Sequence, residues 1–197
     1  MATWLKEVNL QGHGVTLEPL RSEHAEELRA AVQDGELWKL WFTLVPRLED
    51  VESYVASALQ MQEEGSAVPF LIRTTADGKA VGSTRFCNID HANQRAEIGY
   101  TWLAKSVQRT SANSACKLLL LQYVFEDRQA IALEFRTHWH NAASRRAILR
   151  LGAKQDGVLR QHRRESHGGF RDTVVFSILD SEWPPVKKGL QASLARS

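Results

Sequence analysis

Cysteine is scarce in this sequence, because the 197 residues contain only Cys87 and Cys116. The first falls on a predicted strand and the second on a predicted helix, so their positions do not match a metal-binding motif. We therefore expect both thiols to be reduced and buried as packing residues. We expect no metal site.

Long apolar runs are missing as well. No window of about 18 apolar residues could cross a bilayer, and Met1 to Gly12 lacks the apolar segment of a secretory signal. We therefore expect a cytoplasmic protein without a membrane partner.

An excess of charge of either sign is also absent, since 25 Lys and Arg stand against 23 Asp and Glu and leave a net charge of +2. This balance argues against nucleic acid as the main partner. The content of 43% apolar and 24% charged residues is typical of a globular protein, and the length suits one domain. We expect a single domain over residues 1–197, with a core from about residue 15 to 183 and a loose tail at 184–197.

The apolar spacing predicts helices and strands in alternation. Asp77-Gly78 predicts a hairpin turn, and with the next strand this hairpin should form a three-stranded antiparallel meander. His167-Gly168-Gly169 predicts the turn of a final hairpin. The expected helices cover residues 22–35, 48–65, 113–127 and 142–151. An extended run with Val15, Leu17 and Leu20 comes first, and the further expected strands cover 68–74, 81–89, 96–103, 131–137, 158–164 and 173–179.

The turn from Ser106 to Asn113 lies between a predicted strand and the leucine-rich helix 113–127. Small and polar residues there leave backbone N–H groups unpaired at the positive end of the helix dipole, which suits an anion such as pyrophosphate. Arg109 could add a charge-assisted contact. The alternative is an ordinary polar loop in which Asn113 caps the helix.

The helix that Asn141 opens carries a hydroxyl on its apolar face. Ser144 shares this face with Ala147, Ile148 and Leu151, at spacings of three, four and seven residues. The Ser144 side chain could bond to a carbonyl of its own helix or of the preceding turn, or it could reach a ligand.

Several segments together resemble the GCN5-related N-acetyltransferases, and within them the RimJ/RimL-like branch, which acetylates protein N-termini or small amines. They are Glu97-Ile98-Gly99-Tyr100, the turn that opens with Gln108, Asn141-Ala142-Ala143-Ser144 with Leu151-Gly152-Ala153, and the closing run from Arg171 to Ser177. The resemblance implies an α/β fold: a strongly bent mixed β-sheet of about seven strands, flanked by helices and splayed open between its fourth and fifth strands.

The same resemblance implies that acetyl-coenzyme A (acetyl-CoA) binds in the splay. Backbone groups of Trp102 and Leu103 would hold the pantetheine arm, together with the Asn141 side chain, and Ser144 would lie near the thioester sulfur. The pyrophosphate would lie on the amides of Gln108, Arg109, Thr110, Ser111, Ala112 and Asn113. The family usually has glycine or alanine where this sequence has Ser111 and Asn113, and we expect binding to survive this departure.

The resemblance further implies transfer of an acetyl group to a primary amine by direct attack. Glu97 is the candidate general base, unless it is a strand-end carboxylate paired with Arg95 or another nearby cation. Ser144 is the candidate proton donor to the departing thiolate, since the tyrosine that some members use further along this helix is absent. The alternatives are a water molecule or no acid at all.

Aromatic residues mark the expected substrate side. Trp38, Trp41 and Phe42 are core residues or line the cleft, and His138 and His140 line it or pack at a subunit contact. Trp139 and Trp183 are expected to be exposed aromatic residues, which makes a homo-oligomer plausible.

Basic residues gather on the last predicted hairpin, and we expect them to form a solvated edge, although an acidic substrate would use the same surface. They are Arg160, His162, Arg163, Arg164 and Arg171. Two rival functions stay open. A succinyl or other acyl donor would call for basic residues at the acyl end of the cleft. A module that senses coenzyme A (CoA) without catalysis would fit the altered turn and the missing tyrosine.

Overall fold

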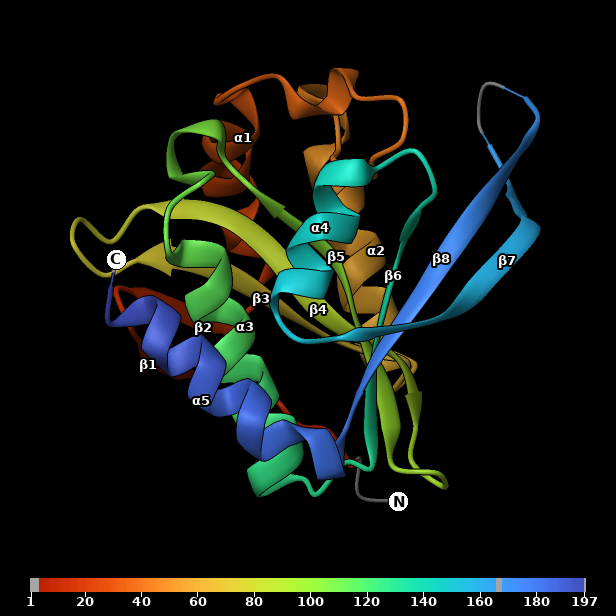
Figure 1. Cartoon of the computed structure of the whole chain (residues 1–197). Helices are drawn as coiled ribbons and strands as arrows, with labels where there is room; N and C mark the ends of the chain where they lie inside the picture. The colour runs from red at the N-terminus through yellow and green to blue at the C-terminus, as the bar shows by residue number, and fades with distance from the viewer. Residues whose placement is uncertain (1–3, 166–167, 197) are drawn as a thin grey trace.

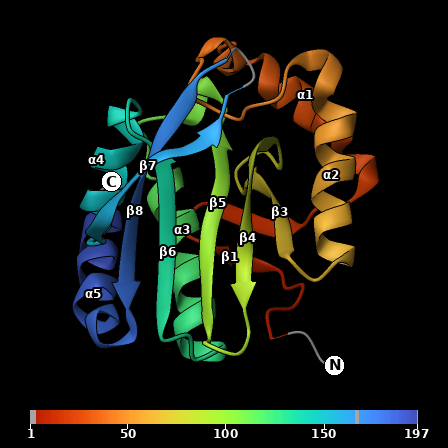
Figure 2. The same cartoon turned by 90° about the vertical axis from the view of Figure 1, so that its right-hand side faces the viewer.

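The computed structural model describes residues 4–165 and 168–196. Their eight strands form one mixed sheet in the order β1-β2-β3-β4-β5-β6-β8-β7 (Figures 1 and 2). The strands are β1 (Leu10–Gly12), β2 (Val15–Pro19), β3 (Ala67–Thr74), β4 (Ala80–Asp90), β5 (Arg95–Leu103), β6 (Ala132–His138), β7 (Lys154–Arg164) and β8 (Phe170–Leu179). The helices are α1 (Ala25–Gln33), α2 (Val51–Glu63), α3 (Ala112–Gln122), α4 (Ala142–Arg150) and α5 (Trp183–Leu194).

The sheet opens between β5 and β6, which are its parallel pair. Arg95, Ala96 and Glu97 pair with Ala132, Leu133 and Glu134, and no further pair joins the two strands in the part of the chain that the structure describes. Since β5 runs on to Leu103 and β6 to His138, their carboxyl-terminal halves diverge. The expected splay is confirmed.

The sheet has one strand more than the seven or so expected. Leu10–Gly12 pairs with β2 through a turn in which His13 and Gly14 have φ angles of 51° and 83°. Three residues are too short to show an alternating pattern, so the sequence could not reveal this strand. Because this strand comes first in the chain, the sheet opens between its fifth and sixth strands, β5 and β6, rather than between its fourth and fifth.

The expected meander is confirmed, because β3, β4 and β5 pair antiparallel in sequence order. Gly78, in the turn between β3 and β4, has a φ of 69°, which glycine adopts without strain. The final hairpin is confirmed by the pairing of β7 with β8. Of its expected turn, Gly168 and Gly169 have φ angles of 90° and 88°, whereas His167 lies outside the described residues.

Helices cover both faces of the sheet, with α3 and α5 side by side on one face and α1 and α2 on the other (Figures 1 and 2). The helix α3 buries its apolar stripe, including Cys116, Leu120 and Leu121, and a π-helical turn from Tyr123 to Asp127 extends it. The buried apolar side chains form one continuous core. No helix in the described part of the chain is long and apolar enough to span a membrane.

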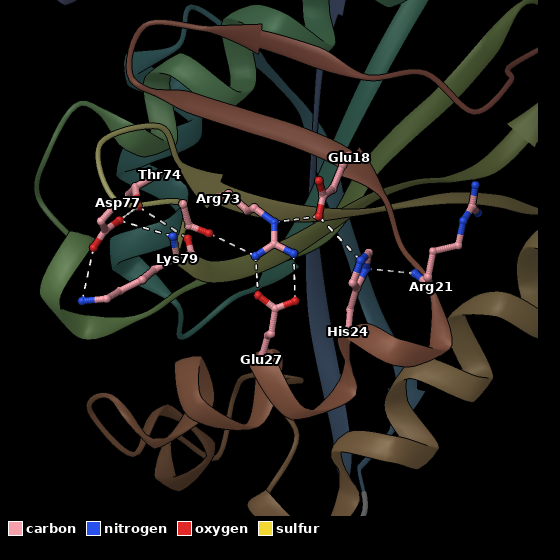
Figure 3. A network of polar contacts seen from close by, with 9 residues as sticks. Glu18, Arg21, His24, Glu27, Arg73, Thr74, Asp77 and Lys79 are labelled. Carbon is pink, nitrogen blue, oxygen red and sulfur yellow. Dashed lines mark hydrogen bonds and ion pairs between the residues drawn. The ribbon is translucent and has the colours of Figure 1, made fainter.

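A network of ion pairs ties α1 to the sheet, away from the splay (Figure 3). The Arg73 guanidinium of β3 donates to Glu18 of β2 at 2.7 Å and to Glu27 of α1 at 2.8 Å. These two carboxylates raise the pKa of Arg73. The network helps to hold α1, and α1 leads into the segment 37–45 that reaches the cleft described below.

The expectation of a loose tail at 184–197 is wrong, because Trp183–Leu194 form the helix α5. Trp183 is buried, stacks on Phe125 with ring centroids 5.5 Å apart, and donates from Nε1 to Glu126 at 2.7 Å. The two prolines that suggested an irregular tail lie in the first turn of the helix, where a backbone N–H has no helical partner to lose.

We expect Trp183→Phe to lower the free energy of unfolding by about 1–2 kcal/mol, because it keeps an aromatic ring beside Phe125 but removes the donor to Glu126. Urea denaturation measures the change. An unchanged midpoint would show that α5 contributes through ring packing alone.

Candidate functional site

A cleft of about 1060 Å³ lies at the splay. Its walls come from β5, β6, the turn before α3, α4, the β7–β8 hairpin and the segment 37–45. The turn before α3, the start of α4 and the strand segment that Glu97 opens therefore contribute to one site.

The turn before α3 presents unpaired backbone donors to the cleft. Five backbone N–H groups of this turn donate a hydrogen bond to no acceptor among the described residues. They belong to Arg109, Thr110, Ser111, Asn113 and Ser114. These donors stand at the positive end of an eleven-residue helix, which favours an anion.

Side chains hold this turn in shape. Gln108 Nε2 donates to the Leu103 carbonyl at 2.9 Å, and Thr110 Oγ1 donates to the Val107 carbonyl at 2.7 Å. Arg109 takes the left-handed conformation, with a φ of 63°.

The N-cap of α3 is Ser111, so the alternative that Asn113 caps the helix is wrong. Ser111 has ordinary helical angles, with φ −69° and ψ −13°. No glycine is required at this position for backbone reasons, because only positive φ values favour glycine over other residues.

The open edge of β5 carries Trp102 and Leu103. A Cβ on Gly82 of β4 would lie 2.1 Å from the Trp102 carbonyl oxygen, so this carbonyl points toward β4 and only glycine fits opposite it. The Leu103 carbonyl accepts the Gln108 bond. Both carbonyls thus face protein groups already.

Glu97 is a buried carboxylate in the cleft, with 7% of its surface exposed. Asn88 Nδ2 donates to it at 2.7 Å, and Arg136 Nε lies 3.5 Å from it. Burial raises its pKa, although Asn88 and Arg136 act in the opposite direction. The carboxylate is not paired with Arg95, which binds Glu134 at 2.9 Å instead, so the nearby cation is Arg136.

Asn141 and Ser144 lie on the opposite wall, at the start of α4. Asn141 Oδ1 caps the helix by accepting the Ser144 N–H at 3.0 Å, which leaves its amide nitrogen without a partner among residues 4–165 and 168–196. The Ser144 hydroxyl likewise bonds to no described residue, so the alternative that it bonds back to a carbonyl is not observed.

The aromatic segment divides between cleft and packing. Phe42 lines the cleft, whereas Trp41 packs against the His138 ring with centroids 5.0 Å apart. Trp38 packs against the core and is absent from the described lining of the cleft. His138 is buried and binds Glu165 at 2.8 Å. In the described ranges no three His, Cys, Asp or Glu residues gather as a metal site would require.

Both cysteines are free and buried, as expected. Cys87 lines the cleft beside Glu97, and burial raises the pKa of its thiol to about 12. At neutral pH this group is therefore protonated and a poor nucleophile.

The sequence analysis missed Lys117 of α3, which is buried and lines the cleft. Its Nζ donates to Thr101 Oγ1 at 2.7 Å, and that hydroxyl lies 2.7 Å from Thr84 Oγ1. Burial lowers the pKa of Lys117 to about 8. Its place on the apolar stripe, three and four residues before Leu120 and Leu121, was the signal that could have revealed it.

We expect Lys117→Met to raise the free energy of unfolding by about 1–2 kcal/mol at pH 7, because it removes a desolvated charge that no carboxylate of the described residues neutralises. The unfolded chain binds this proton more tightly than the folded chain does. The stability of the unmodified protein should therefore rise with pH between about 8 and the ordinary lysine value of 10.5, and that of the variant should not. Urea denaturation at pH 7, 8.5 and 10 tests both expectations, and an equal pH dependence would contradict them.

Comparison with known proteins agrees with this geometry. The acetyltransferase (GNAT) domain model matches residues 15–154. A GCN5-related N-acetyltransferase from Brucella melitensis has a TM-score of 0.85 and 32% identity, over 96% of this chain and 86% of that one. Mycobacterium smegmatis RimJ in complex with CoA-disulfide has the same fold, with a TM-score of 0.77 and 22% identity over 95% and 93% of the two chains.

Bacillus subtilis YdaF, provisionally named a ribosomal N-acetyltransferase, is 31% identical over 107 residues. This alignment covers 54% of the present chain and 57% of YdaF. On the match of its domain and the full-length structural similarity, this chain belongs to the GNAT acetyltransferase family.

Proposed function

We propose that this protein transfers an acetyl group from acetyl-CoA to a primary amine by direct attack. The observation that carries the proposal is that one cleft holds both the buried carboxylate of Glu97 and a set of unpaired backbone donors that suit an anion. These donors are the N–H groups of Arg109, Thr110, Ser111, Asn113 and Ser114.

The residues present fit the cofactor. The five unpaired N–H groups and the Arg109 side chain suit a pyrophosphate, and the free Asn141 amide suits an amide carbonyl of the pantetheine arm. A structure of a related fold, the Microcin C7 self-immunity acetyltransferase, contains acetyl-CoA, which supports this assignment. When bound, acetyl-CoA supplies an acetyl thioester.

Glu97 acts as the general base in this proposal. An amine must lose a proton to attack, and the raised pKa of Glu97 moves it toward the range in which a carboxylate accepts that proton effectively. An α-amine with a pKa near ~8 loses its proton at neutral pH far more readily than a lysine near ~10.4. We therefore propose a protein N-terminus or a small α-amine as the acceptor.

Ser144 is the proposed proton donor to the departing thiolate, since its hydroxyl faces the cleft without a partner in the described chain. Direct attack is favoured over an acyl-enzyme because the Cys87 thiol beside Glu97 is protonated at neutral pH.

Thiol release from acetyl-CoA tests the proposal, with peptides that have a free N-terminus and otherwise identical peptides whose N-terminus is blocked. We expect release with the free peptides only. Calorimetric binding of CoA without turnover of any amine would favour the non-catalytic module instead.

An anionic acyl donor has one observation in its favour, because Arg136, Arg163 and Arg171 line the cleft. A panel of acetyl-CoA and succinyl-CoA separates the two donors. A strong preference for succinyl-CoA would replace acetyl as the transferred group.

A further inference from the structure

Two arginines face each other at the hairpin wall of the cleft. Arg163 of β7 and Arg171 of β8 are partners in the strand register, and both line the cleft. Like charges directly opposite each other destabilise a sheet. This pair is therefore not explained as a stabilising feature of the hairpin.

Neither guanidinium has a carboxylate partner in residues 4–165 and 168–196. The polar contact of Arg171 is from Nε to Thr173 Oγ1, at 3.1 Å. The neighbouring basic side chains differ, because Arg136 binds Glu134 at 2.9 Å and Arg160 binds Asp172 at 2.6 Å. Arg164 lies over the Phe170 ring, 4.7 Å from its centroid.

Arg171 is also half-buried. Burial lowers the pKa of Arg171, and the charge of Arg163 lowers it further, although Glu165 and Glu97 act in the opposite direction. The positive charge is therefore only partly compensated where it stands. A bound anion would remove this cost, since a desolvated charge is stabilised by a hydrogen-bonded partner of opposite sign.

The pair is close enough to Glu97 to influence it electrostatically. Arg163 lowers the pKa of Glu97, and Glu97 raises that of Arg171. On β8 the register partner of His138 is Thr173, and His138 packs against Trp41 of the substrate-side segment. The arginines therefore lie on the side of the cleft where an acceptor would approach the base.

We propose that Arg163 and Arg171 bind a carboxylate of the acceptor, so that the substrate is an amine with a carboxylate nearby, such as a peptide that begins with an acidic residue. This inference rests on the proposed acetyl transfer and deepens it. The planar guanidinium fork suits a carboxylate, which it can bind through two parallel hydrogen bonds.

The test uses the full chain, saturating acetyl-CoA and two peptides that differ only in starting with aspartate or asparagine. We expect a higher kcat/KM for the aspartate peptide. Arg163→Gln and Arg171→Gln should each lower the ratio of kcat/KM for the aspartate peptide to kcat/KM for the asparagine peptide by roughly 10- to 100-fold. Arg164→Gln is the matched control, because its guanidinium lies on the Phe170 ring and outside the described lining of the cleft, and it should change neither value.

The outcomes separate the inference from the function on which it rests. Turnover of neither peptide, nor of any other amine, would overturn the proposed function and the inference with it. Equal turnover of both peptides would leave acetyl transfer standing and overturn the inference. Use of succinyl-CoA that the two arginine variants abolish, with no acceptor preference, would assign the pair to the acyl donor and also overturn it.

Discussion

Replacing Glu97 by glutamine is expected to lower kcat by about 100- to 10,000-fold, the usual contribution of a positioned general base. Glutamine has nearly the same shape and can still contact Asn88, but it cannot accept a proton from the amine. CoA affinity should change little, because the turn before α3, on which we expect the pyrophosphate, forms a different wall of the cleft. Steady-state kinetics and calorimetry on the same preparation measure both quantities.

The pH profile gives an independent check on Glu97. The base is active when ionised, so kcat/KM should fall as the pH falls through the pKa of Glu97. Since burial raises that pKa, the acid limb should lie above the ordinary value of 4.5 and should disappear in Glu97→Gln.

Glu134→Gln is the matched control for Glu97. Glu134 is the register partner of Glu97 on β6 and binds Arg95 and Arg136. It lies outside the described lining of the cleft. The substitution should therefore cost much less activity. An unchanged rate in Glu97→Gln would remove Glu97 from the mechanism.

The second large effect is expected from Ser111→Asp, which should weaken CoA binding roughly 100-fold or more, because two like charges about 4 Å apart repel strongly near a protein surface. The free energy of unfolding should not fall. Ser111 is the N-cap of α3, and aspartate is a favourable N-cap that also complements the helix dipole.

Ser111→Asn separates charge from size, since asparagine has the shape of aspartate without its charge and should bind CoA far better. Ser111→Gly should preserve or tighten binding. Clear weakening in Ser111→Gly would mean that the serine hydroxyl is itself a ligand. Calorimetry measures the CoA affinity of Ser111→Asp. An unchanged affinity would contradict the proposal that the pyrophosphate binds to the turn before α3.

The sequence was sufficient where a local pattern determines the structure. The helical spacing of five apolar residues predicted α3, namely Cys116, Leu119, Leu120, Tyr123 and Val124. Asp77-Gly78 predicted the β3–β4 turn. Glu97 was found because it opens the segment Glu97–Tyr100 that resembles the family; the structure buries it in the cleft, and its catalytic role stays a prediction.

The arginine pair could not be predicted in the same way. The β7–β8 register shifts between Leu159 and Arg163, and Gln161 within this stretch has a φ of 50°. Such an irregularity changes which residues face the cleft, so simple alternation along the strand does not place the Arg163 side chain. For Lys117 the obstacle was different, because its neighbours Thr101 and Thr84 come from two strands that only the folded sheet brings together.

A structure of the protein with CoA bound tests the central claim most directly. We expect the pantetheine arm between β5 and β6 and the thiol between Glu97 and Ser144. The pyrophosphate should lie on the unpaired N–H groups of Arg109, Thr110, Ser111, Asn113 and Ser114. A pyrophosphate bound elsewhere, or a thiol that points away from Glu97, would contradict the account.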